Sequence, residues 1–134
     1  MVGARSKYSG ITAIGLSVCA LSLSLLSAGC GNNNAGSAQS AADSTTKSVY
    51  DDDVPGVTQN FDDTLKAQVT RSEVGIMSDQ MHQLGDYKGL KFVNSDPNKN
   101  EYTYRADFSK GSGNVVVRLD SDGRFAAYRF LVPK

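Results

Sequence analysis

The C-terminal part of the chain alternates between apolar and polar residues, and this pattern limits its possible folds more than any other feature. Residues 101–108 are the clearest case, with Tyr102, Tyr104, Ala106 and Phe108 on one face and Thr103, Arg105 and Asp107 on the other. Comparable runs cover 88–94, 115–119 and 124–132. Clusters of turn-forming residues separate the runs at 95–100, 109–114 and 120–123. Four strands joined by short turns predict an antiparallel meander.

The segment before these strands has apolar residues at helical spacing. They are Phe61, Leu65, Val69, Ile76, Met77, Met81 and Leu84. Asn60 is a candidate N-cap and Gly85 a candidate C-cap. Gly75 lowers helix stability by about 1 kcal/mol relative to Ala. The pattern therefore predicts either one helix or two, with the break near residues 72–75. Met77 and Met81 are expected in the core, with an adaptable contact surface as the alternative.

A helix followed by four strands predicts an α+β two-layer sandwich over residues 58–134, with the helix packed on one face of the meander. This element order resembles that of the cystatin-like fold, which some small bacterial lipoproteins carry. It is also similar to that of small outer-membrane assembly lipoproteins, in which helices precede three strands. The similarity concerns element order alone, so it implies no function.

The first 30 residues have the layout of a secretory targeting segment. Arg5 and Lys7 supply a positive start, an uncharged apolar stretch covers residues 11–26, and small residues lead to Cys30. The sequence Leu-Leu-Ser-Ala-Gly-Cys resembles the lipobox of bacterial lipoprotein precursors, with Ser27 where that family usually has Leu. The resemblance implies a signal peptide over residues 1–29, cleavage between Gly29 and Cys30, and a diacylglycerol on the Cys30 thiol.

Two other interpretations of this segment remain open. One is an ordinary secretory signal without a lipid, and the other is an uncleaved transmembrane helix. The apolar stretch is diluted by Ser and Gly and is shorter than the span of about 20 residues that a bilayer requires. Cys19 lies inside this stretch and would be removed with the signal peptide.

Residues 30–57 are rich in Gly, Asn, Ser, Ala, Thr and Asp and hold few large apolar residues. Such a composition predicts a lipidated Cys followed by a flexible linker, with an r.m.s. reach of about 30 Å. The linker would act as a spacer between the membrane and the domain. Asp51, Asp52 and Asp53 are expected to be solvated, with weak cation binding as the alternative.

The charged residues argue against several function classes. The chain has 14 basic and 14 acidic residues, and two of the basic ones precede Cys30. No nucleic-acid partner is expected, because such binders need a positive face. His82 is the single His and has no recognisable nucleophile motif, so we predict a non-enzymatic protein with no cofactor. Asp120 and Asp122 are expected to form a turn rather than a metal site.

The best candidate for binding is the outer face of the predicted sheet. Arg105, Arg118 and Arg129 fall on that face, where they would suit an acidic partner or simply keep the surface soluble. We therefore predict a membrane-anchored adaptor on the extracytoplasmic face of a bacterial cell membrane. It would be held by the lipid on Cys30 and would bind a protein of the envelope. The alternative is an inhibitor or immunity-type protein that blocks a cell-surface enzyme.

Overall fold

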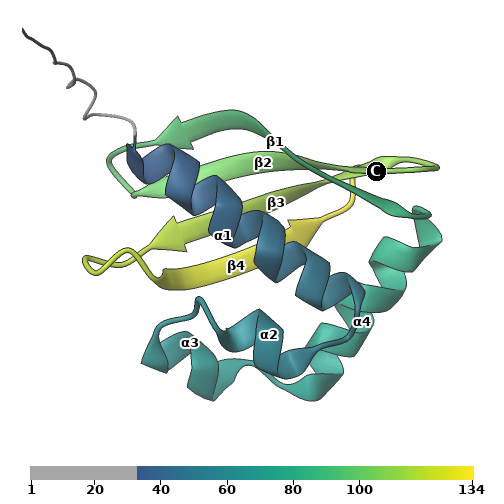
Figure 1. Ribbon diagram of the computed structural model, residues 1–134, viewed down its shortest axis with the longest axis horizontal. Coiled ribbons are helices and arrows are strands. Elements are labelled where there is room, and N and C mark those ends of the chain that lie inside the picture. The colour runs from purple at the N-terminus through teal and green to yellow at the C-terminus, as the bar shows by residue number, and fades with distance from the viewer. Residues whose placement is uncertain (1–32) are drawn as a thin grey trace, which may run out of the picture. The chain divides into compact units, whose positions relative to one another are not determined.

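Four helices precede a four-stranded sheet in the computed structural model, which describes residues 33–134 (Figure 1). The predicted signal peptide, Cys30 and the cleavage position after Gly29 lie outside the described residues. The helices are α1 (Asn33–Tyr50), α2 (Val54–Thr58), α3 (Asp63–Gln68) and α4 (Arg71–Gln83). The strands are β1 (Tyr87–Asp96), β2 (Glu101–Phe108), β3 (Ser112–Leu119) and β4 (Phe125–Leu131). The predicted α+β class is confirmed.

The sheet is an open antiparallel meander with the strand order β1-β2-β3-β4. Its inner face is apolar, because the alternation in β2 buries Tyr104, Ala106 and Phe108 and leaves Arg105 exposed. Each strand continues this face, with Val115 opposite both Tyr104 and Phe130. The pattern in the sequence therefore predicted the four strands and their two faces, although β1 and β3 extend into the segments 95–100 and 109–114 that were expected to be turns.

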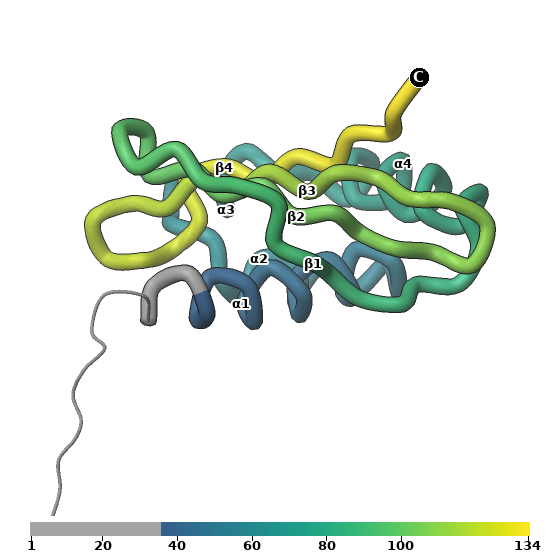
Figure 2. Tube along the Cα trace, turned by 90° about the horizontal axis from the view of Figure 1, so that it is seen from above, coloured from purple at the N-terminus to yellow at the C-terminus, as the bar shows by residue number. Residues whose placement is uncertain are grey.

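Helix α1 covers the inner face of the sheet (Figures 1 and 2). The flexible linker predicted for residues 30–57 is therefore wrong over the part that the structure describes, because α1 and α2 occupy most of it. The buried residues of α1 recur at helical spacing and are Ala38, Ala42, Thr45, Thr46 and Val49. They are small, so the helix packs closely against the aromatic side chains of the sheet. Within the described residues, the folded unit already includes α1, which begins at Asn33, rather than starting at residue 58.

The predicted helix over residues 61–84 is two helices, and the break lies before Gly75. Helix α3 ends at Gln68, and α4 begins after Thr70 with a capping box. The Thr70 hydroxyl accepts the Glu73 N–H, while the Glu73 carboxylate accepts the Thr70 N–H at 2.9 Å. Gly75 lies inside α4 and does not interrupt it. Asp62, not Asn60, is the N-cap of α3, and it accepts the Leu65 N–H at 2.7 Å.

The segment between α2 and α3 pairs with the free edge of the sheet. Phe61 forms a parallel bridge with Phe125, the first residue of β4. The Phe125 N–H donates to the Asn60 carbonyl at 2.8 Å, and the Asp62 N–H donates to the Phe125 carbonyl at 2.9 Å. Phe61 is 1% exposed. This contact places α3 beside β4, where the candidate site lies.

Three further helices separate α1 from the sheet along the chain, so the element order departs from a single helix followed directly by strands. Among residues 33–134, no helix combines the length and hydropathy needed to cross a bilayer.

Candidate interaction site

An apolar groove lies between α3 and α4 on one side and the edge strand β4 on the other. The helices contribute Leu65, Val69, Ile76 and Met77, and the strand contributes Phe130 and Leu131. The groove has a volume of about 390 Å³. Ile76 and Leu131 remain 57% and 49% exposed. Large apolar side chains that stay exposed around a groove are typical of a surface that binds another protein.

The break between α3 and α4 creates this groove. Val69 has an extended backbone, with φ −78° and ψ 132°, so α4 starts in a new direction. Ile76, which the continuous helical stripe would place in the core, is exposed at the groove instead. Met81 is fully buried, as expected, whereas Met77 is only partly buried and lines the groove. One of the two methionines is thus in the core and the other is available for contact.

The strand side of the groove also offers backbone groups. β4 is an edge strand of the sheet that the described residues form. Phe125 directs its N–H and carbonyl toward the free edge, since both bond to residues 60–62. The register shift between Arg118 and Leu119 interrupts the alternation, so Ala127, Arg129 and Leu131 pair with β3, and the same groups of Tyr128 and Phe130 face the free edge. An extended peptide is therefore able to pair with β4 beside the apolar side chains of α3 and α4.

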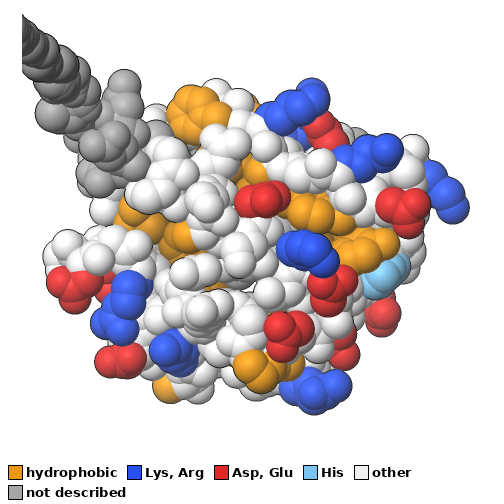
Figure 3. All heavy atoms as spheres, viewed as in Figure 1, with side chains coloured by type: hydrophobic (Ala, Val, Ile, Leu, Met, Phe, Trp, Pro, Cys, Tyr) orange, Lys and Arg blue, Asp and Glu red, His pale blue; other side chains and the backbone are white. Residues whose placement is uncertain are grey.

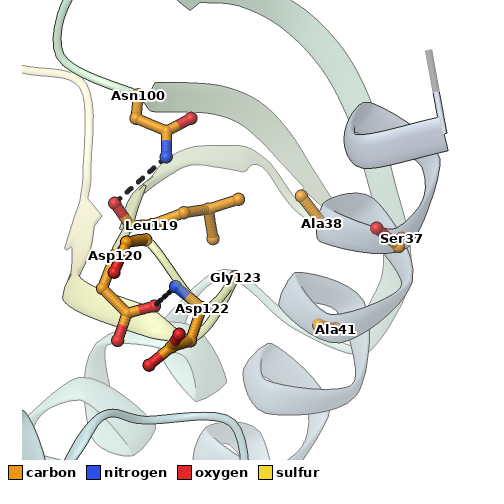
Figure 4. A pocket seen from close by; sticks show the side chains of 9 residues that line it. Ser37, Ala38, Ala41, Asn100, Leu119, Asp120, Asp122 and Gly123 are labelled. Atoms are coloured by element: carbon orange, nitrogen blue, oxygen red, sulfur yellow. Dashed lines mark hydrogen bonds between the residues drawn. The ribbon is translucent and has the colours of Figure 1, made fainter. Parts of the chain in front are cut away.

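A second cavity is more polar and lies between the first half of α1 and the β3–β4 turn. It has a volume of about 490 Å³, and Figure 4 shows Ala38 and Ala41 facing Asp120, Asp122 and Gly123 across it. The Asp120 carboxylate accepts the N–H groups of Asp122 at 2.9 Å and Arg124 at 2.8 Å. Asp120 therefore stabilises the turn, as the sequence predicted. No group of three potential metal-binding side chains occurs in residues 33–134.

The predicted arginine face lies on the outer side of the sheet. Arg105 pairs with Asn114, Arg129 with Val116, and Arg118 with Ala127, which places all three side chains on the same side. Two of them are neutralised there, because Arg105 contacts Asp107 at 2.8 Å and Arg129 contacts Glu101 at 3.1 Å. Arg118 makes no ion pair with any described residue. The outer face is a mixed-charge surface rather than a basic patch.

Asp107 is the centre of the charge cluster on this face. Lys91 on β1 lies 3.0 Å from its carboxylate, in addition to Arg105. The hydrogen bond from Lys91, together with that from Arg105, lowers the pKa of Asp107 below its ordinary value of 3.8. The face that carries α1 likewise has basic and acidic side chains interspersed (Figure 3). Neither face has a single strong sign of charge to select an acidic partner.

His82 occupies a structural position near the C-terminal end of α4. It is exposed, as the pale blue side chain in Figure 3 shows. Its ring lies 4.0 Å from the Tyr50 ring, centroid to centroid. Its Nε2 lies 2.9 Å from the Tyr50 carbonyl oxygen, which also accepts the Ser78 hydroxyl at 3.0 Å. The imidazole thus joins the ends of α1 and α4. No described carboxylate orients it as a general base would require.

Comparisons with known proteins add no family to this picture. No protein-family model, curated protein or solved structure matches the chain. The interpretation of the groove therefore rests on its own residues.

Sequence reasoning missed the groove because its two sides are far apart along the chain. Leu65 and Leu131 are brought together only when α3 packs on β4. One local signal was present, because Thr70 and Glu73 form the Thr-x-x-Glu pattern of a capping box. That pattern locates the start of α4, and with it the change of direction that exposes Ile76.

Proposed function

We propose that this protein is a non-catalytic, membrane-anchored lipoprotein that binds an envelope protein through the groove between α3, α4 and β4. The exposure of Ile76 and Leu131 around that groove is the observation that carries the proposal. Interface cores are more apolar than the rest of the surface and are enriched in methionine, and Met77 lies in the same groove. The Arg129 and Glu73 side chains at the margins supply a polar rim.

The partner chemistry follows from the strand edge. An extended segment of the partner would add to β4 as a further strand, with backbone hydrogen bonds along the edge and apolar side chains directed to Ile76, Met77 and Leu131. The bridge between Phe61 and Phe125 is a short example of this mode within the chain itself. An unprotected edge strand is otherwise a liability for aggregation, so a bound segment would also protect β4.

The anchor is the lipid on Cys30, which the lipobox-like sequence supports. A diacylglycerol supplies two acyl chains, and two chains hold a protein stably where one holds it only marginally. The bound partner would therefore be recruited to the extracytoplasmic face of the membrane.

Two experiments test the separate parts of this proposal. A photoreactive amino acid in place of Ile76 should cross-link one dominant protein in intact cells, while the same amino acid in place of the exposed Ser121 should not. Leu131→Lys should then abolish the cross-link, because it places a charge in the apolar groove. Equal cross-linking from both positions would refute the groove as the binding site.

The anchor is tested by cell fractionation. Cys30→Ser should release the protein from membranes into the extracytoplasmic soluble fraction. A Cys30→Ser protein that remains in the membrane fraction as firmly as the unmodified chain would refute the lipid anchor, whatever the outcome of the cross-linking.

A further inference from the structure

We infer that the domain lies directly on the bilayer, with the exposed pair Phe92 and Val93 of β1 in contact with the membrane interface. This inference rests on the lipid anchor proposed above. It goes beyond that anchor because it assigns a membrane-contacting surface to the folded domain. The edge strand β1, which lies opposite the groove at β4, would then contact the membrane.

The first step is the length of chain between the lipid and the domain. Helix α1 begins at Asn33, three residues after Cys30. Three residues span at most about 10 Å even when fully extended. The domain therefore has no spacer that would hold it away from the membrane, and the start of α1 must lie close to the headgroups.

The second step is the identity of the surface near that start. The hydroxyl of Tyr87 on β1 donates to the Asp43 carboxylate, and the Gln39 side chain donates to the Leu90 carbonyl at 3.3 Å. Helix α1 and strand β1 therefore run in opposite directions, and the start of α1 lies near the end of β1. The six residues from Gln39 to Asn33 advance about 9 Å along the helix, which matches about three residues of strand. This places the start of α1 beside Phe92 and Val93, and Figure 1 shows the start of α1 next to the end of β1.

The third step is the character of these two residues. Phe92 is 49% exposed and Val93 is 51% exposed, although both are large and apolar. The register of β1 against β2 shifts between Phe92 and Asn94, so Val93 is left without a partner in the ladder. The Phe92 and Tyr104 rings pack edge to face, with centroids 6.1 Å apart. Such a half-exposed aromatic residue is suited to the boundary between headgroups and acyl chains.

The charged residues at this end of the domain indicate which surface, β1 or the β3–β4 turn, faces the bilayer. Strand β1 carries two exposed basic residues, Lys88 and Lys91, of which Lys91 also contacts Asp107. The one acidic residue of β1 is Asp96. The β3–β4 turn carries Asp120 and Asp122, which an anionic membrane repels. The domain should therefore tilt so that β1 contacts the bilayer and the β3–β4 turn stays in water.

The test uses tryptophan fluorescence, because the chain has no Trp of its own. The variants Phe92→Trp and Val93→Trp would each be purified as the lipidated full-length protein and inserted into phosphatidylethanolamine–phosphatidylglycerol vesicles. Doxyl-labelled lipids would then quench the fluorescence of residues at the interface. Ser121→Trp is the matched control, since it lies at the same end of the domain, and Ile76→Trp is a second control in the groove.

We expect quenching at positions 92 and 93 to exceed that at positions 121 and 76 by about twofold or more, because only interfacial residues meet the labelled lipid. Solubilising the vesicles in unlabelled detergent should remove the difference. Unfolding midpoints in urea would establish that each variant is folded.

Three results would overturn the inference. Equal quenching at positions 92 and 121 would mean that the lipid on Cys30 alone brings the domain near the bilayer, without an apolar contact through β1. No quenching in a protein that still sediments with vesicles would refute the contact and leave the anchor intact. A protein that does not associate with vesicles at all would refute the anchor, and the contact with it.

Discussion

The hydroxyl of Thr46 on α1 lies 2.8 Å from the hydroxyl of Tyr128 on β4, and this hydrogen bond joins the first helix to the last strand. Thr46 is fully buried. Burial raises the pKa of Tyr128 above its ordinary range, because the charged form would lose its solvation. The two residues are 82 positions apart in the sequence, so this hydrogen bond is a long-range tertiary contact.

Thr46→Val should destabilise the protein by roughly 1–3 kcal/mol, because it removes a partner of the Tyr128 hydroxyl at constant side-chain shape. The measurement is the free energy of unfolding in urea. Ser44→Val on the exposed side of α1 is the matched control. The double variant Thr46→Val/Tyr128→Phe should recover part of the loss, since no polar group is then left unpaired. A single variant as stable as the control would contradict the role of this bond.

The opposite result is expected for Tyr104. Its hydroxyl is buried and has no hydrogen-bond partner among the described residues, and burial raises the pKa of Tyr104 to about 12. Tyr104→Phe removes this unpaired group and keeps the ring, so stability should stay the same or rise by up to about 1 kcal/mol. Urea unfolding of Tyr104→Phe beside Tyr128→Phe checks the contrast. A loss at position 104 as large as that at position 128 would show that the Tyr104 hydroxyl has a partner in solution.

The helix that replaces the expected linker should be indispensable. A chain that begins at Thr58 lacks α1 and exposes the inner face of the sheet, including Tyr104 and Val115. It should show no cooperative unfolding transition, whereas a chain that begins at Asn32 should unfold in a single transition. Circular dichroism followed during urea unfolding distinguishes them. Equal transitions in the two chains would mean that residues 32–57 do not stabilise the domain.

Two glycines in and after α4 should respond to alanine in opposite directions. A Cβ at Gly75 meets no atom within 4 Å, so Gly75→Ala should stabilise the helix by about 0.5–1 kcal/mol. Gly85 has a φ of 94°, and a Cβ there would collide with Ser109 and approach the Lys110 nitrogen at 3.1 Å. Gly85→Ala should therefore destabilise the protein by more than about 1 kcal/mol. Thermal unfolding of both variants tests the signs, and a shift in the same direction would contradict one of these assignments.

The charge cluster around Asp107 predicts a pH dependence. Because Lys91 and Arg105 lower the pKa of Asp107 in the folded protein, this carboxylate contributes stability at pH values above its ordinary value of 3.8. The contribution is lost as pH falls through the lower folded-state pKa. Asp107→Asn should therefore lower the melting temperature at pH 7 and have a diminishing effect below pH 3.8. Asp79→Asn on the exposed surface of α4 is the control. A difference that persists unchanged in acid would assign the loss to something other than charge.

Local patterns were sufficient for the sheet. The alternation around Tyr104 and Val115 specified both strands and their buried faces, because the period of a strand is two whatever it packs against. Gly85 was recognisable as a helix end, and Asp120 as part of a turn, because both act through their own backbone neighbourhood. The arginine face was also placed correctly, since alternation alone separates Arg105 from Tyr104.

Helix α1 was missed because its stabilisation is tertiary. Ala42 and Thr45 have little apolar surface, so composition alone indicates a flexible segment. Both are fully buried once the inner face of the sheet lies against them. The small side chains that suggest disorder in isolation are the ones that permit close packing on Tyr104 and Phe108.

The sequence by itself therefore determined the strands, their faces and the turns between them, since these depend on residues a few positions apart. Only the tertiary structure decided where the folded unit begins and that Ile76 and Leu131 meet in one groove. Those outcomes depend on which surfaces bury one another. Burial free energy is a property of contacts between distant segments and leaves no fixed period along the chain.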